Sequence, residues 1–125
     1  MRLHVIKPNK IKHKRPSKVR IDTKLGTFSF SRIAAEMMAL DGMEGIVIYQ
    51  DEDNPKDWYM LPTPQRTADS HRLRRAKQDI LFSNVNTARK IAASLTINEE
   101  KFSMLIGPRD ETTSMFPIIT ASAKK

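Results

Sequence analysis

Two stretches of the chain carry positively charged side chains close together. In "KVRID", residues 18–22, Lys18 and Arg20 lie on one side of a predicted strand, and Lys24 follows in the next turn. A second group comes later, in "RLRRAK", and consists of Arg72, Arg74, Arg75 and Lys77. Cations at this spacing can contact phosphates along a nucleic-acid backbone. Lysine on edge strands also prevents aggregation, so a solvent-facing edge is the alternative interpretation.

The excess charge is confined to one end of the chain. The net charge is +8, and residues 1–26 contain nine Lys or Arg and one acid, whereas residues 27–125 contain thirteen of each kind. This distribution is typical of an arm that binds a polyanion. We therefore predict a basic N-terminal arm at 1–17, whose phosphate contacts are Lys10, Lys12, Lys14 and Arg15. A solubility tail is the alternative.

The remaining polar residues favour neither catalysis nor metal binding. His4, His13 and His71 are scattered without metal-ligand spacing, and the chain has no cysteine. The acidic run "DEDNPKD" lacks the spacing and the glycine of a calcium-binding loop. We therefore expect no enzyme activity, no cofactor and no metal. The absence of cysteine fits a reducing compartment, and apolar stretches of only a few residues predict no membrane span, so we expect a cytoplasmic protein.

Hydrophobic alternation identifies the elements that position the first basic strand. "KVRID" and "TFSF" alternate around a turn that contains Gly26, which indicates a hairpin. Ser31 is a suitable N-cap for a helix over "RIAAEMMAL", residues 32–40. "GIVIYQ" and "WYMLP" then read as two further strands around an acidic turn. The sequence thus predicts the order strand, strand, helix, strand, strand over residues 18–62.

The same order returns in the second half of the chain. After a polar linker, "RLRRAKQDILFS", "NTARKIAASL", "KFSMLIG" and "MFPIITA" repeat the pattern over 71–121. We therefore predict a single α+β domain at 18–125 made of two pseudo-repeats, 18–62 and 71–121. It would be a duplicated ββαββ unit with a mainly antiparallel sheet or barrel and two helices. Pairing of the halves would bring their basic first strands together. Two unrelated stretches of ordinary pattern are the alternative.

Two adjacent aromatic residues occupy the predicted fourth strand. Trp58 and Tyr59 should point to opposite faces of that strand, one into the core and one outward. An outward ring beside the basic strands could stack on unpaired bases. An aromatic residue that only fills the strand is the alternative.

The stretch "KVRIDTKLGTFSFSRIAAEMMALDGMEGIVIYQ" resembles the SpoVT/AbrB-type swapped-hairpin DNA-binding domain. The shared order is a basic strand, an L-G turn, a second strand, a helix that ends near a glycine, and two more strands. The resemblance implies a dimeric or duplicated barrel with Lys18, Arg20 and Lys24 as DNA contacts. That family usually has Arg after the turn glycine and Pro before the helix, where this chain has Thr27 and Ser31.

From Gly45 onward the predicted order is four strands followed by the second helix. This order, together with "FSFS" and "KDWYM", resembles more loosely the Pur-alpha and Whirly type of single-strand nucleic-acid binders. Together the patterns predict a non-enzymatic nucleic-acid binder, in the first place a DNA-binding transcriptional regulator rather than an RNA binder. The alternatives are a single-strand binder and an interaction module whose basic arm docks on an acidic protein. Whether the chain also forms a homodimer stays open.

Overall fold

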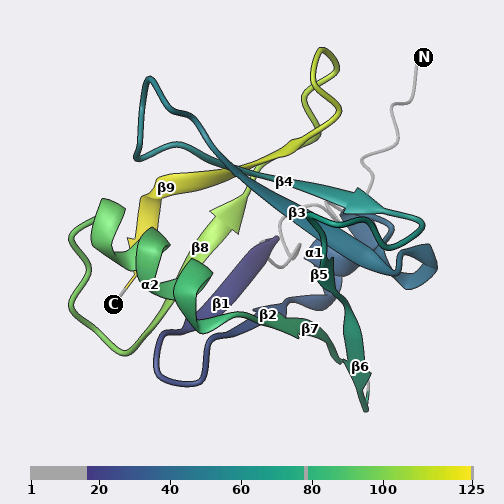
Figure 1. The fold of residues 1–125 in the computed structure, drawn as a ribbon, viewed down its shortest axis with the longest axis horizontal. Coiled ribbons are helices and arrows are strands. Elements are labelled where there is room, and N and C mark those ends of the chain that lie inside the picture. Colours follow the sequence, from purple (N-terminus) through teal and green to yellow (C-terminus); the bar gives the residue numbers. More distant parts are fainter. Residues whose placement is uncertain (1–16, 78, 125) are drawn as a thin grey trace, which may run out of the picture.

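The computed structural model describes residues 17–77 and 79–124, and each half of the chain runs through a hairpin, a helix and a second hairpin (Figure 1). The first half contains β1 (Lys18–Asp22), β2 (Thr27–Phe30), α1 (Arg32–Met37), the 3-10 turn η2 (Leu40–Gly42), β3 (Gly45–Gln50) and β4 (Trp58–Thr63). The second half contains β5 (His71–Arg72), β6 (Arg74–Ala76), β7 (Asp79–Ser83), α2 (Val85–Ser94), β8 (Lys101–Ile106) and β9 (Phe116–Lys124).

The strands form one antiparallel sheet that nearly closes on itself. Its order is β5-β3-β4-β9-β8-β1-β2-β7-β6. The two end strands, β5 and β6, are consecutive pieces of the segment 71–76, interrupted at Leu73. One piece pairs with β3 and the other with β7, so this segment joins the two edges of the sheet. The expected α+β class with an antiparallel barrel and two helices is confirmed for the described residues.

The two halves interleave around the barrel. Strand β2 pairs with β7 and β4 pairs with β9, so each half contributes strands to both sides of the molecule (Figure 1). Inside, alternate residues of the strands form a single core, including Val19, Ile21, Phe28 and Phe82, all with 0% exposure. Burial of these apolar side chains removes them from water and stabilises the barrel.

Both helices have a polar N-cap, and the first begins after Ser31 as the sequence predicts. Ser31 caps α1 by accepting a hydrogen bond from the Ala34 amide, and Asn84 caps α2 by accepting one from the Thr87 amide. The predicted length of the first helix is wrong, because α1 ends at Met37 instead of continuing to Leu40. Ala39 adopts a left-handed conformation with φ of 52°. The chain reverses there, and Leu40 is fully buried in the core.

His71 lies at the seam where the barrel closes. It pairs with Ile46 across β5 and β3, and its ring stacks on Phe82 with centroids 5.0 Å apart. Burial lowers the pKa of His71 below its usual 6.5, because water cannot hydrate the charged form of the ring well in this packed position. The folded barrel therefore favours the neutral imidazole.

This environment predicts that the barrel loses stability as the pH falls below 6.5. Well above that pH the imidazole is neutral in both states. As the pH falls through 6.5, the unfolded chain binds a proton more readily than the folded chain, whose pKa at His71 is lower. Urea unfolding at pH 7.5 and 5.5 should show this loss in the natural chain and a smaller one in His71→Phe. An equal loss in both proteins would show that other groups cause the pH dependence.

Candidate nucleic-acid interface

The first hairpin presents its cations outward because alternate residues are buried. Val19 and Ile21 are fully buried, so Lys18 and Arg20, which alternate with them, point away from the core and are exposed. Strand β6 is the last strand in the sheet order, and its three residues are all exposed. Leu73 before it is 5% exposed, and Arg74 pairs with Leu81, the neighbour of the inward Phe82, so Arg74 points outward. The Arg74 Nη2 donates a hydrogen bond of 2.8 Å to the Ser83 hydroxyl of β7.

Pairing of β2 with β7 joins the two basic hairpins into one four-stranded surface. Arg20 lies opposite Ser29, Ser29 opposite Leu81, and Leu81 opposite Arg74. Directly opposed residues of an antiparallel sheet share a face, so these four side chains form one row across the outside of the barrel. Three strand spacings place the two arginine α-carbons about 14 Å apart. We call the outward side of β1, β2, β7 and β6 the basic face.

Two further predicted cations lie at the two ends of the basic face. Lys24 is in the turn between β1 and β2, and Lys77 is in the turn between β6 and β7. Because β2 and β7 run antiparallel, these turns lie at opposite ends of the paired strands. Lys77 has φ of 59°, the left-handed conformation that a tight hairpin turn requires. Arg72 is exposed on β5, outside the four-stranded surface.

Arg75 is a predicted phosphate contact that points away from the basic face. It pairs with Ile80, whose side chain packs against the core, so Arg75 points to the other side of the strand from Arg74. Its guanidinium donates hydrogen bonds to the carbonyls of Leu40, Asp41 and Met43, and its Nε is 3.8 Å from the Asp41 carboxylate. These bonds hold the end of the first-half helix region against the second half, which is a structural role.

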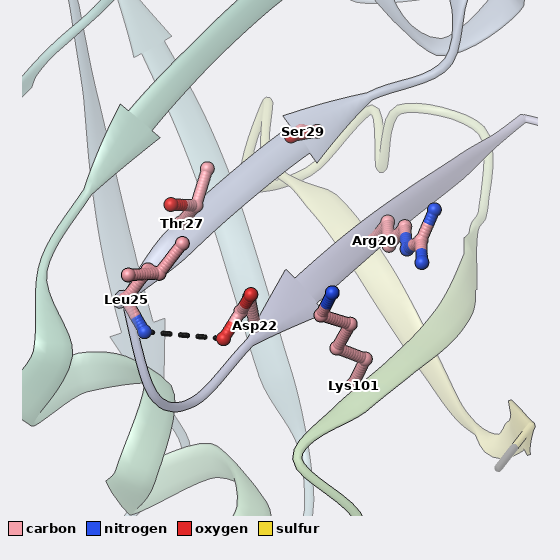
Figure 2. A pocket seen from close by; sticks show the side chains of 6 residues that line it. All are labelled: Arg20, Asp22, Leu25, Thr27, Ser29 and Lys101. Carbon is pink, nitrogen blue, oxygen red and sulfur yellow. Dashed lines mark hydrogen bonds between the residues drawn. The ribbon is translucent and has the colours of Figure 1, made fainter.

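A shallow pocket opens beside the basic face and contains a cation that the sequence did not single out. It measures about 240 Å³ and is lined by Arg20, Asp22, Leu25, Thr27, Ser29 and Lys101. Figure 2 shows Arg20 and Lys101 on one side of Asp22, with Leu25 and Thr27 on the other. Lys101 begins β8 and lies opposite Asp22. The alternation of "KFSMLIG" exposes Lys101, but only the pairing of β8 with β1 brings it beside Arg20.

The pocket suits an anionic group better than a whole cofactor. Small-molecule sites usually enclose about 300–1,000 Å³, which exceeds this volume. Across residues 17–77 and 79–124, neither Arg20 nor Lys101 forms an ion pair. The Asp22 carboxylate accepts hydrogen bonds from the amides of Lys24 and Leu25, at 2.9 and 3.1 Å. These two amides satisfy one oxygen of the carboxylate within the turn.

The two predicted stacking residues have different environments. Trp58 is the inward ring, 4% exposed, and its indole N–H donates a 2.9 Å hydrogen bond to the Ser94 hydroxyl of α2. A base cannot stack on this ring. Tyr59 points outward and lies opposite Tyr49, which is 42% exposed. Strands β9 and β8 separate β4 from β1, and β3 and β5 separate it from β6 across the seam, so Tyr59 does not lie beside the basic face.

The predicted arm contacts Lys10, Lys12, Lys14 and Arg15 lie outside the described residues. Within the described part of the chain, no three His, Asp or Glu side chains are grouped as metal ligands. No helix there combines the length and apolar character needed to cross a membrane. Comparisons of the chain with protein-family models, curated proteins and solved structures found no match.

The bonds of Arg75 predict a measurable loss of stability when its side chain is replaced. Arg75→Met keeps most of the apolar stem and removes three hydrogen bonds from a partly exposed guanidinium, which should cost about 1–2 kcal/mol of unfolding free energy. Arg74→Met is the matched control, because it removes one exposed bond and should change stability by less than about 0.5 kcal/mol. Urea unfolding measures both. Equal losses would contradict the structural role of Arg75.

Proposed function

We propose that this protein binds nucleic acid without catalysis and that its basic face contacts the phosphates. The observation that carries the proposal is the pairing of β2 with β7, because it places Arg20 and Arg74 in one row on one surface. Two separate basic strands would be ordinary solvent-facing edges. Joined, they present cations over several strand widths, which suits a chain of phosphates.

The charge distribution of the rest of the barrel supports this orientation. The β3–β4 turn contains Asp51, Glu52, Asp53 and Asp57, and the β8–β9 turn contains Asp110 and Glu111. Figure 1 shows these turns on the side of the barrel away from the β1–β2 and β6–β7 hairpins. A polyanion would be repelled from the acidic turns and attracted to the basic face. The basic arm, which precedes Lys18 in the chain, would add further phosphate contacts without reading sequence.

The symmetry of the topology supports the proposal that the chain is a duplicated ββαββ unit. Let β1 correspond to the β5–β6 segment, β2 to β7, β3 to β8 and β4 to β9. If every strand is replaced by its counterpart from the other half, the order of strands around the barrel stays the same, read in the opposite direction. The exchange maps Arg20 onto Arg74 across the β2–β7 pair, and it maps the Lys24 turn onto the Lys77 turn. This arrangement fits the SpoVT/AbrB-type resemblance, although no sequence or structure comparison supports that family assignment.

The approximate two-fold relation favours duplex DNA over a single strand as the target. A duplex has two-fold symmetry of its own, and symmetric DNA-binding proteins align with it. A single strand would instead benefit from aromatic stacking next to the cations. Trp58 is buried and Tyr59 lies three strands from β1 in the sheet order, so the basic face lacks that platform. We therefore propose duplex DNA as the target, and a cytoplasmic DNA-binding regulator as the role of the protein.

A salt series of binding measurements tests the proposal. Fluorescence anisotropy with duplex DNA, single-stranded DNA and RNA of equal length should show the tightest binding to the duplex. The slope of log K against log salt is negative, and each phosphate that the protein neutralises on duplex DNA makes it steeper by about 0.9. The double variant Arg20→Gln/Arg74→Gln should therefore make the slope shallower by about 1.8.

The matched control removes two cations from the acidic side of the barrel. Lys56→Gln/Arg109→Gln changes the net charge by the same amount, in the β3–β4 and β8–β9 turns. This variant should leave the slope unchanged. Equal slope reductions in both double variants would show that net charge, not the basic face, determines binding. Absence of binding to all three nucleic acids at low salt would reject the proposed function.

A further inference from the structure

Leu25 has the most exposed large apolar side chain in the part of the chain that the structure describes. It is 65% exposed, compared with 42% for Tyr49 and Ile119 and 36% for Leu105. A single exposed leucine is ordinary on a protein surface. Its setting is what distinguishes Leu25, because it lies at the tip of the basic β1–β2 hairpin and lines the pocket with Arg20 and Lys101 (Figure 2).

The hairpin tip, residues 23–26, is held by hydrogen bonds on both sides of Leu25. The Leu25 amide donates to the Asp22 carboxylate, and the Gly26 amide donates to the Asp22 carbonyl at 2.8 Å. The Gly26 carbonyl in turn accepts a 2.7 Å bond from the Asn84 amide, at the start of α2. These bonds hold the backbone on both sides of Leu25 in place while its side chain stays in solvent.

Gly26 allows the tip to approach α2 closely. Its φ is 73°, and an added β-carbon would lie 2.6 Å from the Val85 α-carbon. Only glycine fits both the left-handed conformation and this contact. The tip is therefore packed against the helix, and Leu25 is presented by a fixed support. Insertion of a side chain into a ligand costs less conformational entropy when its backbone is already ordered.

We propose that Leu25 is a wedge that inserts between neighbouring bases of the bound nucleic acid, while Arg20 and Lys101 hold an adjacent phosphate. The inference rests on the proposed function and names a contact within it. Nucleic acids place flat apolar base surfaces near phosphates. This pocket likewise combines an apolar side chain on one side of Asp22 with two cations on the other side, and these cations form no ion pair in the described chain. Leucine is among the side chains that proteins use to unstack and kink a base step.

A duplex with 2-aminopurine at several positions tests the wedge directly, because this base analogue becomes more fluorescent when it is unstacked. Binding of the natural protein should increase the fluorescence. Leu25→Ala should abolish the increase and weaken binding about ten-fold, since the wedge loses most of its apolar surface. The slope of log K against log salt should stay unchanged, because no phosphate contact is removed. Leu25→Met, which keeps an apolar side chain of similar length, should retain the signal.

Ile119→Ala is the control, because it removes another exposed aliphatic side chain from β9, away from the hairpin tip. It should leave both fluorescence and affinity unchanged. A natural protein that binds without any fluorescence increase, or a Leu25→Ala variant that keeps the increase, would overturn the wedge while the proposed function stands. A natural protein that binds no nucleic acid would overturn both.

Discussion

The pairing of β2 with β7 determines the rest of the structure, and a stack of aromatic rings stabilises it. Phe28 and Phe82 lie directly opposite each other, fully buried, with ring centroids 4.3 Å apart and nearly parallel planes. Phe82 also contacts Phe30 and stacks on His71, which belongs to the segment that closes the barrel. One ring therefore connects both hairpins and the seam. Aromatic pairs of this kind contribute about 0.5–1.5 kcal/mol beyond the burial of their area.

The interior stack and the exterior row belong to the same strand pairs, so folding and charge placement are coupled. In β2 and β7 the phenylalanines occupy the inward positions, and Ser29 and Leu81 occupy the outward positions between Arg20 and Arg74. The placement of the two arginines therefore depends on the same β2–β7 pairing that the stack stabilises. The surface between them is uncharged, because serine and leucine fill its centre. A cationic row with a neutral middle can contact phosphates at both ends while a flat part of the ligand lies between them.

Local sequence patterns predicted the elements well, because their signals are short in range. Alternation identified the β1–β2 hairpin, and "GIVIYQ" matches β3 residue for residue. The predicted helix over 32–40 was too long. Ala39 adopts a left-handed conformation after the helix ends, and no pattern of side chains in the sequence indicates this. The sequence could not supply the partners of the strands. Lys101 was therefore missed, and Trp58 stayed a candidate although its indole bonds to Ser94 inside the barrel. Both outcomes depend on contacts between residues far apart in the chain.

Arg74 and Arg75 show how narrowly the register defines this surface. They are neighbours in sequence, yet one joins the outward row and the other bonds three backbone carbonyls near the end of the first-half helix. A shift of β6 by one residue would exchange their directions, because side chains alternate along a strand. Burial of Leu73 before the strand and pairing of Arg75 with Ile80 prevent that shift. Composition alone cannot distinguish the two arginines. The core determines which of them reaches the basic face, and charge placement on the outside of the barrel thus follows from packing inside it.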